Sequence, residues 1–298
     1  MTSANPMSSG RYIKWHHKLL YGMHELSLHA IEVFLRLYLI VHFAERVKLP
    51  PWMTGIALLV SLVWDAWIEP WVGRQSDSWY ASGRSRWPWV LGGTLASGFS
   101  LLLMFAIPPE WGPAMCFAAL LASSFLLNTS LAFASVPYAA LVGDVRGNGD
   151  DQSQLIAWRL AFGSFGSLVG IALPGFFLSN KDLNPFYQSA WAFTICLFLF
   201  GFLASLSRPA FLPLAKNFEV LPEWQMSWRQ LFSRFPRPPE GIIAFLFAGF
   251  ILNVGLTINS STALPFYKQA LQFNDSEVQW ILLLFFACLI LFIPFWLW

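Results

Sequence analysis

The stretch from Trp52 to Val72, WMTGIALLVSLVWDAWIEPWV, is long and apolar enough to cross a membrane as a helix, yet it contains two carboxylates, Asp65 and Glu69. Four residues bring a helix round to within about 40° of its starting direction, so both acids share one face. Charged groups inside a bilayer are costly and usually face a functional cavity. The stretch therefore predicts a helical membrane protein in which Asp65 and Glu69 bind one small cation or relay a proton.

Pro70 directly follows these acids and modifies their surroundings. Because proline has no N–H, the carbonyl of Ala66 loses its helical partner and becomes a third candidate oxygen ligand for Na⁺. The alternative is that each acid pairs with an Arg or Lys of a neighbouring helix. No cofactor is expected besides the coupling ion, Na⁺ or H⁺, and no other metal site.

The composition extends the membrane prediction to the whole chain. Of 298 residues, 56% are hydrophobic and 11% are charged, against roughly a quarter charged in a soluble domain. The fold class is therefore all-α, a polytopic helical bundle in a lipid bilayer. Its net charge of +2 does not indicate nucleic-acid binding, and its three cysteines lie in apolar runs without metal-site spacing. Apolar runs predict eight spans, at residues 19–43, 52–72, 88–107, 113–142, 155–178, 186–206, 241–266 and 278–298.

The distribution of basic residues predicts the orientation. If the N-terminus is cytoplasmic, thirteen Lys and Arg residues lie in inside segments, while the outside loops hold only Arg46, Lys48, Lys181 and Lys268. Cytoplasmic loops carry the excess of positive charge, so residues 1–18 are predicted to be a cytoplasmic segment. No cleavable apolar segment follows them directly, so no signal peptide is expected, and the location is the plasma (inner) membrane.

The first span carries an ionisable stripe. Glu25, His29, Glu32 and Arg36 follow spacings of four, three and four residues, which stack them on one side of a helix. We interpret the stripe as a wall of a substrate site or proton relay, with His29 able to change charge near neutral pH. The alternative to a functional stripe is that Glu32 and Arg36 pair with each other. For Glu25 taken alone, we favour a side chain that extends to the cytoplasmic interface of the membrane.

A short polar loop is predicted after the second span, GRQSDSWYASGRSRWPW, beginning at Gly73. Its Asp77, Arg84 and Arg86 are ordinary positive-inside anchors on composition alone. Because Gly73 is expected to end the helix that carries Asp65 and Glu69, these groups are also candidates for an inner latch that opens when helices rock.

The fourth span contains NTSLAFASVPYAAL, in which Pro137 is expected to break the helix. Freed backbone inside a membrane is tolerated where it lines a cavity, which makes Ser135 a candidate substrate ligand. For Ser130, a hydroxyl bonded within its own helix is an equal alternative.

The fifth span is predicted to open at Trp158 and Arg159. It carries Gly163, Gly166 and Gly170 at spacings that let helices approach closely, so packing is their main expected role.

Residues 207–240 are rich in proline and mixed charge, and they predict a cytoplasmic linker between a six-helix bundle at 19–206 and the start of a second bundle at 241–298. Within this linker, Trp224 to Phe235 predicts an amphipathic helix on the membrane surface. The seventh span carries Asn253 and Asn259 among several polar residues, which indicates a cavity lining. The eighth span begins after NDSEVQ.

Taken together, the chain resembles the major facilitator superfamily, and within it the glycoside–pentoside–hexuronide:cation symporter group typified by melibiose permease. The residues that carry the resemblance are Tyr21-Gly22, Trp64-Asp65-Ala66, Glu69-Pro70, Gly73, Asp77, Arg84, Arg86, Pro88, Pro137-Tyr138 and Trp158-Arg159.

This resemblance implies a cation site at Asp65 and Glu69 and a substrate cavity lined by the first, fourth and fifth spans and their counterparts in the second half. Sugar-transporting relatives have acids where His29 and Ser135 stand, and a polar residue at Ile68, so the substrate need not be a galactoside, and H⁺ is a candidate ion. Family members have twelve helices, so the chain is expected to lack about four.

The leading hypothesis is a monomeric symporter that couples a cation gradient to uptake of a sugar or glycoside, with Arg36, Arg159, Asn253 and Asn259 as donors. Alternatives are an anionic sugar, a lysolipid, or a non-transporting sensor or remnant. No G-x-S-x-G, H-E-x-x-H or phosphate loop occurs in the sequence, so an enzyme is not expected.

Overall fold

The computed structural model describes residues 13–145, 149–178, 184–211 and 241–274, with scattered residues between 277 and 288. Every regular element in these segments is helical, which confirms the all-α class. Of these helices, α1 to α6 are long and apolar enough to cross a membrane. The elements are α1 (Trp15–Glu45), α2 (Pro51–Ala81), α3 (Trp87–Phe105), the 3₁₀ turn η1 (Pro109–Trp111), α4 (Pro113–Asp144), α5 (Gly149–Leu178), α6 (Pro185–Ser205), α7 (Arg208–Phe211) and α9 (Ile242–Gln269).

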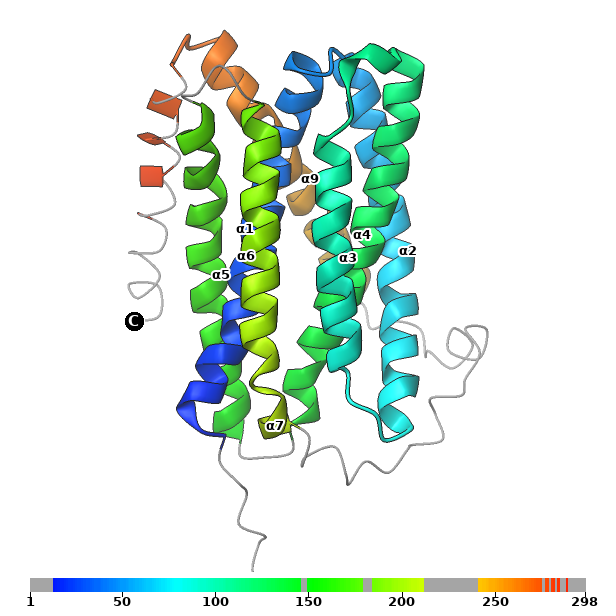
Figure 1. The fold of residues 1–298 in the computed structure, drawn as a ribbon, viewed down its shortest axis with the longest axis vertical. Coiled ribbons are helices and arrows are strands. Elements are labelled where there is room, and N and C mark those ends of the chain that lie inside the picture. The colour runs from blue at the N-terminus through cyan, green and yellow to red at the C-terminus, as the bar shows by residue number, and fades with distance from the viewer. Residues whose placement is uncertain are drawn as a thin grey trace, which may run out of the picture.

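The long helices stand side by side in two groups (Figure 1). In one group α1 packs against α5 and α6, and in the other α4 packs against α2 and α3. Contacts between α3 and α6 join the groups, and α9 contacts α1. The N-terminal end of α1 lies at the same end of the bundle as the α2–α3 loop and α7 (Figure 1).

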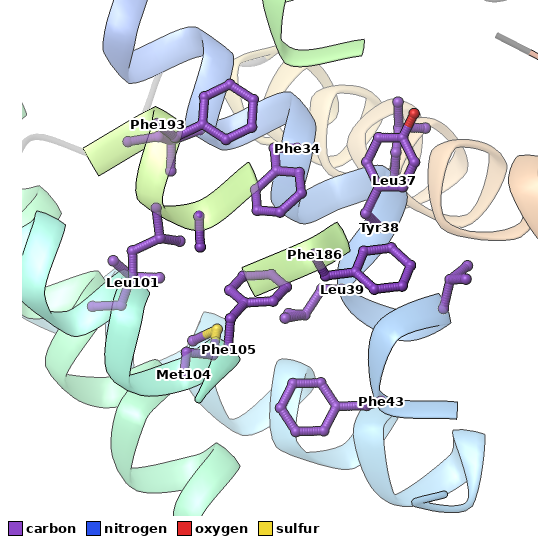
Figure 2. Packing of buried hydrophobic residues seen from close by; sticks show 14 of the residues in the cluster. Phe34, Leu37, Tyr38, Leu39, Phe43, Leu101, Met104, Phe105, Phe186 and Phe193 are labelled. Carbon is purple, nitrogen blue, oxygen red and sulfur yellow. The ribbon is translucent and has the colours of Figure 1, made fainter. Parts of the chain in front are cut away.

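An aromatic core fills the opposite half of the bundle (Figure 2). The fully buried Phe34 of α1 lies with its ring centroid 4.9 Å from Phe105 of α3 and 4.8 Å from Phe193 of α6. Aromatic pairs at such separations stabilise beyond the area that they bury. This core fixes α1, α3 and α6 relative to one another.

Glycines let α5 approach α1 closely. A Cβ added at Gly166 would overlap the Leu26 carbonyl, and one added at Gly170 would lie 2.5 Å from the Ala30 carbonyl oxygen. Small residues are enriched at such membrane helix crossings because they let the backbones meet. The packing role predicted for these glycines is confirmed.

The second helix does not end at Gly73, so the predicted loop is wrong over most of its length. The buried positions Ile68, Val72, Ser76 and Tyr80 keep helical spacing, and α2 runs on to Ala81. The helix ends instead before Gly83, whose φ of 78° is readily available to glycine and whose N–H donates to the Tyr80 carbonyl at 2.9 Å. Asp77 is therefore a helical residue, and only Arg84 and Arg86 lie beyond the helix.

The expected break at Pro137 is also wrong, because α4 is continuous from Pro113 to Asp144. Proline deprives the Phe133 carbonyl of its helical N–H partner. At this peptide α3 comes close to α4, since a Cβ on Gly93 would overlap the Phe133–Ala134 backbone. Dense packing, and not an opened helix, surrounds the proline.

The fifth helix begins earlier than predicted, at Gly149 instead of near Trp158. Asp150 and Asp151, which lie before the predicted fifth span, form the first turn of α5, where acidic side chains interact favourably with the helix dipole. The predicted amphipathic helix at 224–235 and most of the linker and eighth span lie outside the described residues, so the predicted domain division stays a prediction.

Candidate functional site

Two side-chain contacts fix α2 against α4 where Asp65 and Glu69 lie. Trp64 donates from Nε1 to Thr129 Oγ1 at 2.9 Å, and Asn128 donates from Nδ2 to the Ser61 carbonyl at 3.3 Å. Because these bonds set the rotation of α2 about its axis, they also set the direction in which the two acids point.

Asp65 is half-buried and Glu69 is exposed on the part of α2 that α4 leaves uncovered. Within the described ranges, no hydrogen bond or ion pair joins either carboxylate to another residue, so the expected alternative of an Arg or Lys partner is not found there. Two unpaired carboxylates one helical turn apart are suitable ligands for a hard cation. Their assignment as the cation site stays a prediction.

The stripe on α1 divides into two pairs. Arg36 Nη2 lies 2.6 Å from Glu32 Oε1, and both side chains are about half exposed, as the alternative interpretation expected. His29 Nδ1 lies 3.6 Å from Glu25 Oε1. Glu25 is only 8% exposed and does not reach back to the interface, so that expectation is wrong.

Glu25 instead binds Arg159 of α5. The guanidinium donates through Nε at 2.7 Å and through Nη2 at 3.0 Å to the two carboxylate oxygens, a bidentate geometry that is among the strongest available to an ion pair. Both groups are partly buried, and the α1–α5 glycine crossing brings their helices together. The sequence offered one signal for this pair: an arginine and an acid, each in a membrane span, require partners.

Two tyrosines hold the other side of Arg159. The guanidinium lies 4.8 Å from the ring centroid of Tyr138, a cation–π contact. Tyr138 donates to the Tyr21 carbonyl at 2.6 Å, and Tyr21 donates to the Tyr138 carbonyl at 2.7 Å, so α1 and α4 are joined by a reciprocal pair. Both tyrosines were noted in the sequence only as family positions, and hydroxyl pairing between helices cannot be read from spacing.

The candidate latch is centred on Arg86. Its buried guanidinium lies 2.8 Å from Asp77 Oδ1, donates from Nε to Asp144 Oδ2 at 2.8 Å and from Nη1 to Ser76 at 2.7 Å. It therefore ties α2 to the end of α4, and Asp144 is a partner that the sequence did not single out.

The other candidate latch residues do not join this cluster. Arg84 lies over the ring of Trp79, 4.4 Å from its centroid. Gly73 faces Val136, since an added Cβ would lie 3.5 Å from its Cγ1.

A second buried ion pair lies at the same end. Lys18 Nζ of α1 lies 2.5 Å from Asp151 Oδ1 and 2.7 Å from Gln154 Oε1 of α5, and both charged side chains are nearly inaccessible. The two pairs, Lys18–Asp151 and Glu25–Arg159, join α1 to α5 in two places.

The remaining candidate substrate residues are spread more widely. Ser135 is half-buried on α4, while Asn253 and Asn259 are exposed on α9. Ser130 bonds within α4, to the carbonyls of Leu126 and Leu127, as its structural alternative predicted.

Residues 20–298 match a family model described as MFS/sugar transport protein. The chain belongs to this family. The match covers nearly the whole chain and confirms the major facilitator resemblance.

Curated relatives of this MFS/sugar transport protein are symporters. Over 161 residues the chain is 28% identical to the inner membrane symporter YicJ of Escherichia coli, covering 52% of the chain and 34% of that relative. Over 168 residues it is 26% identical to an uncharacterized symporter of Synechocystis, covering 52% of the chain and 30% of that relative. Over 149 residues it is 29% identical to sodium-dependent lysophosphatidylcholine symporter 1-A of Danio rerio, covering 49% of the chain and 26% of that relative. The matched part spans only a quarter to a third of the length of these relatives, which are transporters and not enzymes, as the sequence predicted.

Proposed function

We propose that the protein is a secondary transporter that couples entry of Na⁺ or H⁺ to entry of an uncharged sugar or glycoside. The observation that carries the proposal is the pair Asp65 and Glu69, two carboxylates one turn apart in a membrane span with no counter-ion in the described part of the chain. A bound cation offsets their repulsion, so loading and emptying this site changes the stability of the surrounding helices. That differential stability is what couples an ion gradient to a conformational change.

The charge balance of the other candidate residues favours a neutral substrate. Arg36 and Arg159 are the two arginines that would suit an anionic sugar, yet each is already paired with a carboxylate, Glu32 and Glu25 respectively. Arg159 retains N–H groups that can donate to a sugar hydroxyl. His29, Ser135, Asn253 and Asn259 add further hydrogen-bonding groups in this proposal.

A lysolipid is the second candidate substrate. It rests on the similarity to the relative from Danio rerio, a sodium-dependent lysophosphatidylcholine symporter, which also favours Na⁺ as the ion. The polar stripe on α1 is better matched to a sugar, because a lipid chain gains nothing from hydrogen-bonding groups.

In the proposed cycle the bundle rocks against the second half of the transporter, and the Arg86 cluster with Asp77 and Asp144 closes the inner end. The N-terminus is cytoplasmic, the membrane is the plasma (inner) membrane, and the working unit is a monomer. Charge distribution supports the orientation, and the bacterial relative named as an inner membrane symporter supports the location.

Uptake into vesicles tests the proposal. Labelled neutral glycosides, glucuronides and lysophosphatidylcholine are offered to the reconstituted protein under an imposed Na⁺ or H⁺ gradient. Gradient-driven accumulation of a neutral glycoside is expected, with loss of coupling in Asp65→Asn and Glu69→Gln. Glu110→Gln is the matched control, since Glu110 is an exposed acid in η1.

Each other outcome has a definite meaning. Accumulation of lysophosphatidylcholine alone would replace the sugar by the lipid. Uptake that survives both acid substitutions would remove the cation site from α2. If nothing accumulates under either gradient, the non-transporting sensor becomes the better hypothesis.

A further inference from the structure

Two groups of aromatic rings, each joined by ring contacts, follow one another along α2 and its neighbours. Ring centroids of Trp64 and Phe125 are 5.2 Å apart, and Trp67 lies 5.8 Å from Trp64. Toward the α3 end, the centroid distances are 6.2 Å for Trp71–Phe133, 5.1 Å for Phe133–Trp89 and 6.2 Å for Trp89–Trp79. We call this set the aromatic row: Phe125, Trp64, Trp67, Trp71, Phe133, Trp89 and Trp79.

The exposed tryptophans of the aromatic row, Trp67 and Trp71, and the acid pair lie on opposite flanks of α2. At 100° per residue, and taking the buried Ile68 as the centre of the packed face, Trp71 lies at about −60° and Trp67 at about −100°, whereas Asp65 lies at about +60° and Glu69 at about +100°. Trp67 is 64% exposed and Trp71 is 40% exposed. Trp67 and Trp71 therefore face away from the proposed cation site and present ring surface on the outside of the bundle, while Trp79, at about +20°, lies close to the packed face.

This arrangement differs from an interfacial aromatic belt. Belt residues lie at one depth, at the level of the lipid headgroups. Fifteen residues separate Trp64 from Trp79, a rise of about 22 Å along the helix, whereas one leaflet contributes about 15 Å of hydrocarbon. The row thus runs lengthwise along α2, in the direction of a lipid chain, and not at one depth.

A positive charge lies at the end of the row that is next to the α2–α3 loop. The Arg84 guanidinium stacks 4.4 Å from the centroid of Trp79, and Trp79 Nε1 donates to the Ser85 carbonyl at 3.0 Å, which holds the ring in place. Arg84 is exposed, and the described residues provide no ion pair for it, in contrast to the buried Arg86 with its two carboxylates. Arg74, seven residues after Trp67, adds a second exposed cation on the same flank.

We propose that this flank binds one anionic phospholipid, with its phosphate at Arg84 and an acyl chain along the aromatic row. Charge complementarity selects the headgroup, because a zwitterionic lipid brings no net charge to Arg84. The ring surfaces hold the chain through dispersion and burial. Since the exposed rings that would hold the chain, Trp67 and Trp71, are on the opposite flank from Asp65 and Glu69, this lipid is a bound component of the protein and not its transported substrate.

Native mass spectrometry of the whole purified protein tests the inference. The protein is titrated with dipalmitoyl phosphatidylglycerol and with phosphatidylcholine of the same chains. One phosphatidylglycerol is expected to bind roughly fivefold or more tightly than phosphatidylcholine, as one additional charge contact provides. Arg84→Gln and Trp79→Leu are expected to abolish this preference, whereas Arg208→Gln, at an exposed arginine of α7 outside the row, is expected to preserve it. Size-exclusion profiles check that each variant remains folded.

Three results would overturn the proposal. Equal binding of the two lipids by the wild type excludes a headgroup site. Equal behaviour of Arg84→Gln and Arg208→Gln assigns the preference to general positive charge. If the water-soluble headgroup glycerophosphoglycerol competes as strongly as the lipid does, the site binds a phosphate but no acyl chain. The aromatic row would then not be part of the site.

Discussion

Removal of the Glu25 charge tests whether Arg159 depends on it. In Glu25→Gln the shape of the side chain is kept, but the guanidinium, whose side chain is 21% exposed, loses its charged partner and both charge-assisted hydrogen bonds. Breaking a buried pair from one side costs about 3–5 kcal/mol. Because Arg159 retains some exposure and its contact with Tyr138, we expect about 2–3 kcal/mol loss of unfolding free energy.

A double-mutant cycle separates the pair from the substitutions themselves. Glu25→Gln, Arg159→Met and the double variant are compared by denaturant unfolding in mixed micelles. The double variant is expected to recover most of the stability lost in either single variant, which gives a coupling energy of at least about 1 kcal/mol. Glu32→Gln is the matched control, because the Glu32–Arg36 pair is exposed and is expected to contribute about 0.5 kcal/mol or less. Additive single effects would refute the proposed dependence, and with it the argument that the charge of Arg159 is compensated.

Three further substitutions test the packing and the Arg86 cluster. Gly93→Ala is expected to lower the free energy of unfolding by about 1–3 kcal/mol, because the added Cβ would overlap the α4 backbone. Gly92→Ala, with open space around the added Cβ, is expected to be neutral or stabilising, and thermal unfolding of the two variants measures the difference. Phe34→Ala is expected to cost about 3–5 kcal/mol and exposed Phe99→Ala much less, so similar unfolding midpoints would contradict the core assignment. Arg86→Gln is expected to lower the free energy of unfolding by about 3 kcal/mol, because it leaves the charges of Asp77 and Asp144 uncompensated. Labelling of the cysteine in Asp144→Cys, with and without Arg86→Gln, reports whether the end of the bundle at the Arg86 cluster opens.

Apolar segments and acid spacing could be predicted from sequence because both depend on local geometry. Continuous apolar runs located α1 to α6, and the four-residue interval between Asp65 and Glu69 placed them on one face in advance. Helix ends were less predictable, since glycine ends a helix only where the surroundings favour it. Gly73 lies within a buried stripe that continues to Tyr80, and Gly83 has the left-handed backbone that ends α2.

Contacts between distant spans could not be derived from spacing. Glu25 and Arg159 are 134 positions apart, and their meeting depends on the approach of α1 and α5 at Gly166 and Gly170. The glycines predicted that some helix would pack there, but not which one. For the same reason the sequence treated Glu25 as an interfacial acid and Arg159 as an unpaired donor.

The rotation of α2 about its axis has two consequences that depend on each other. Bonds from Trp64 to Thr129 and from Asn128 to Ser61 hold one face of α2 on α4, so the acids are directed to one flank and the exposed tryptophans to the other. A rotation of one residue, about 100°, would carry Glu69 to the outer flank and Trp67 onto the packed face. Charge and ring surface would then each lie in an unfavourable environment, which penalises the rotated packing twice. The same two bonds therefore orient both the proposed ion site and the proposed lipid site, and Trp64→Phe, which removes one bond and keeps the ring, is expected to weaken both.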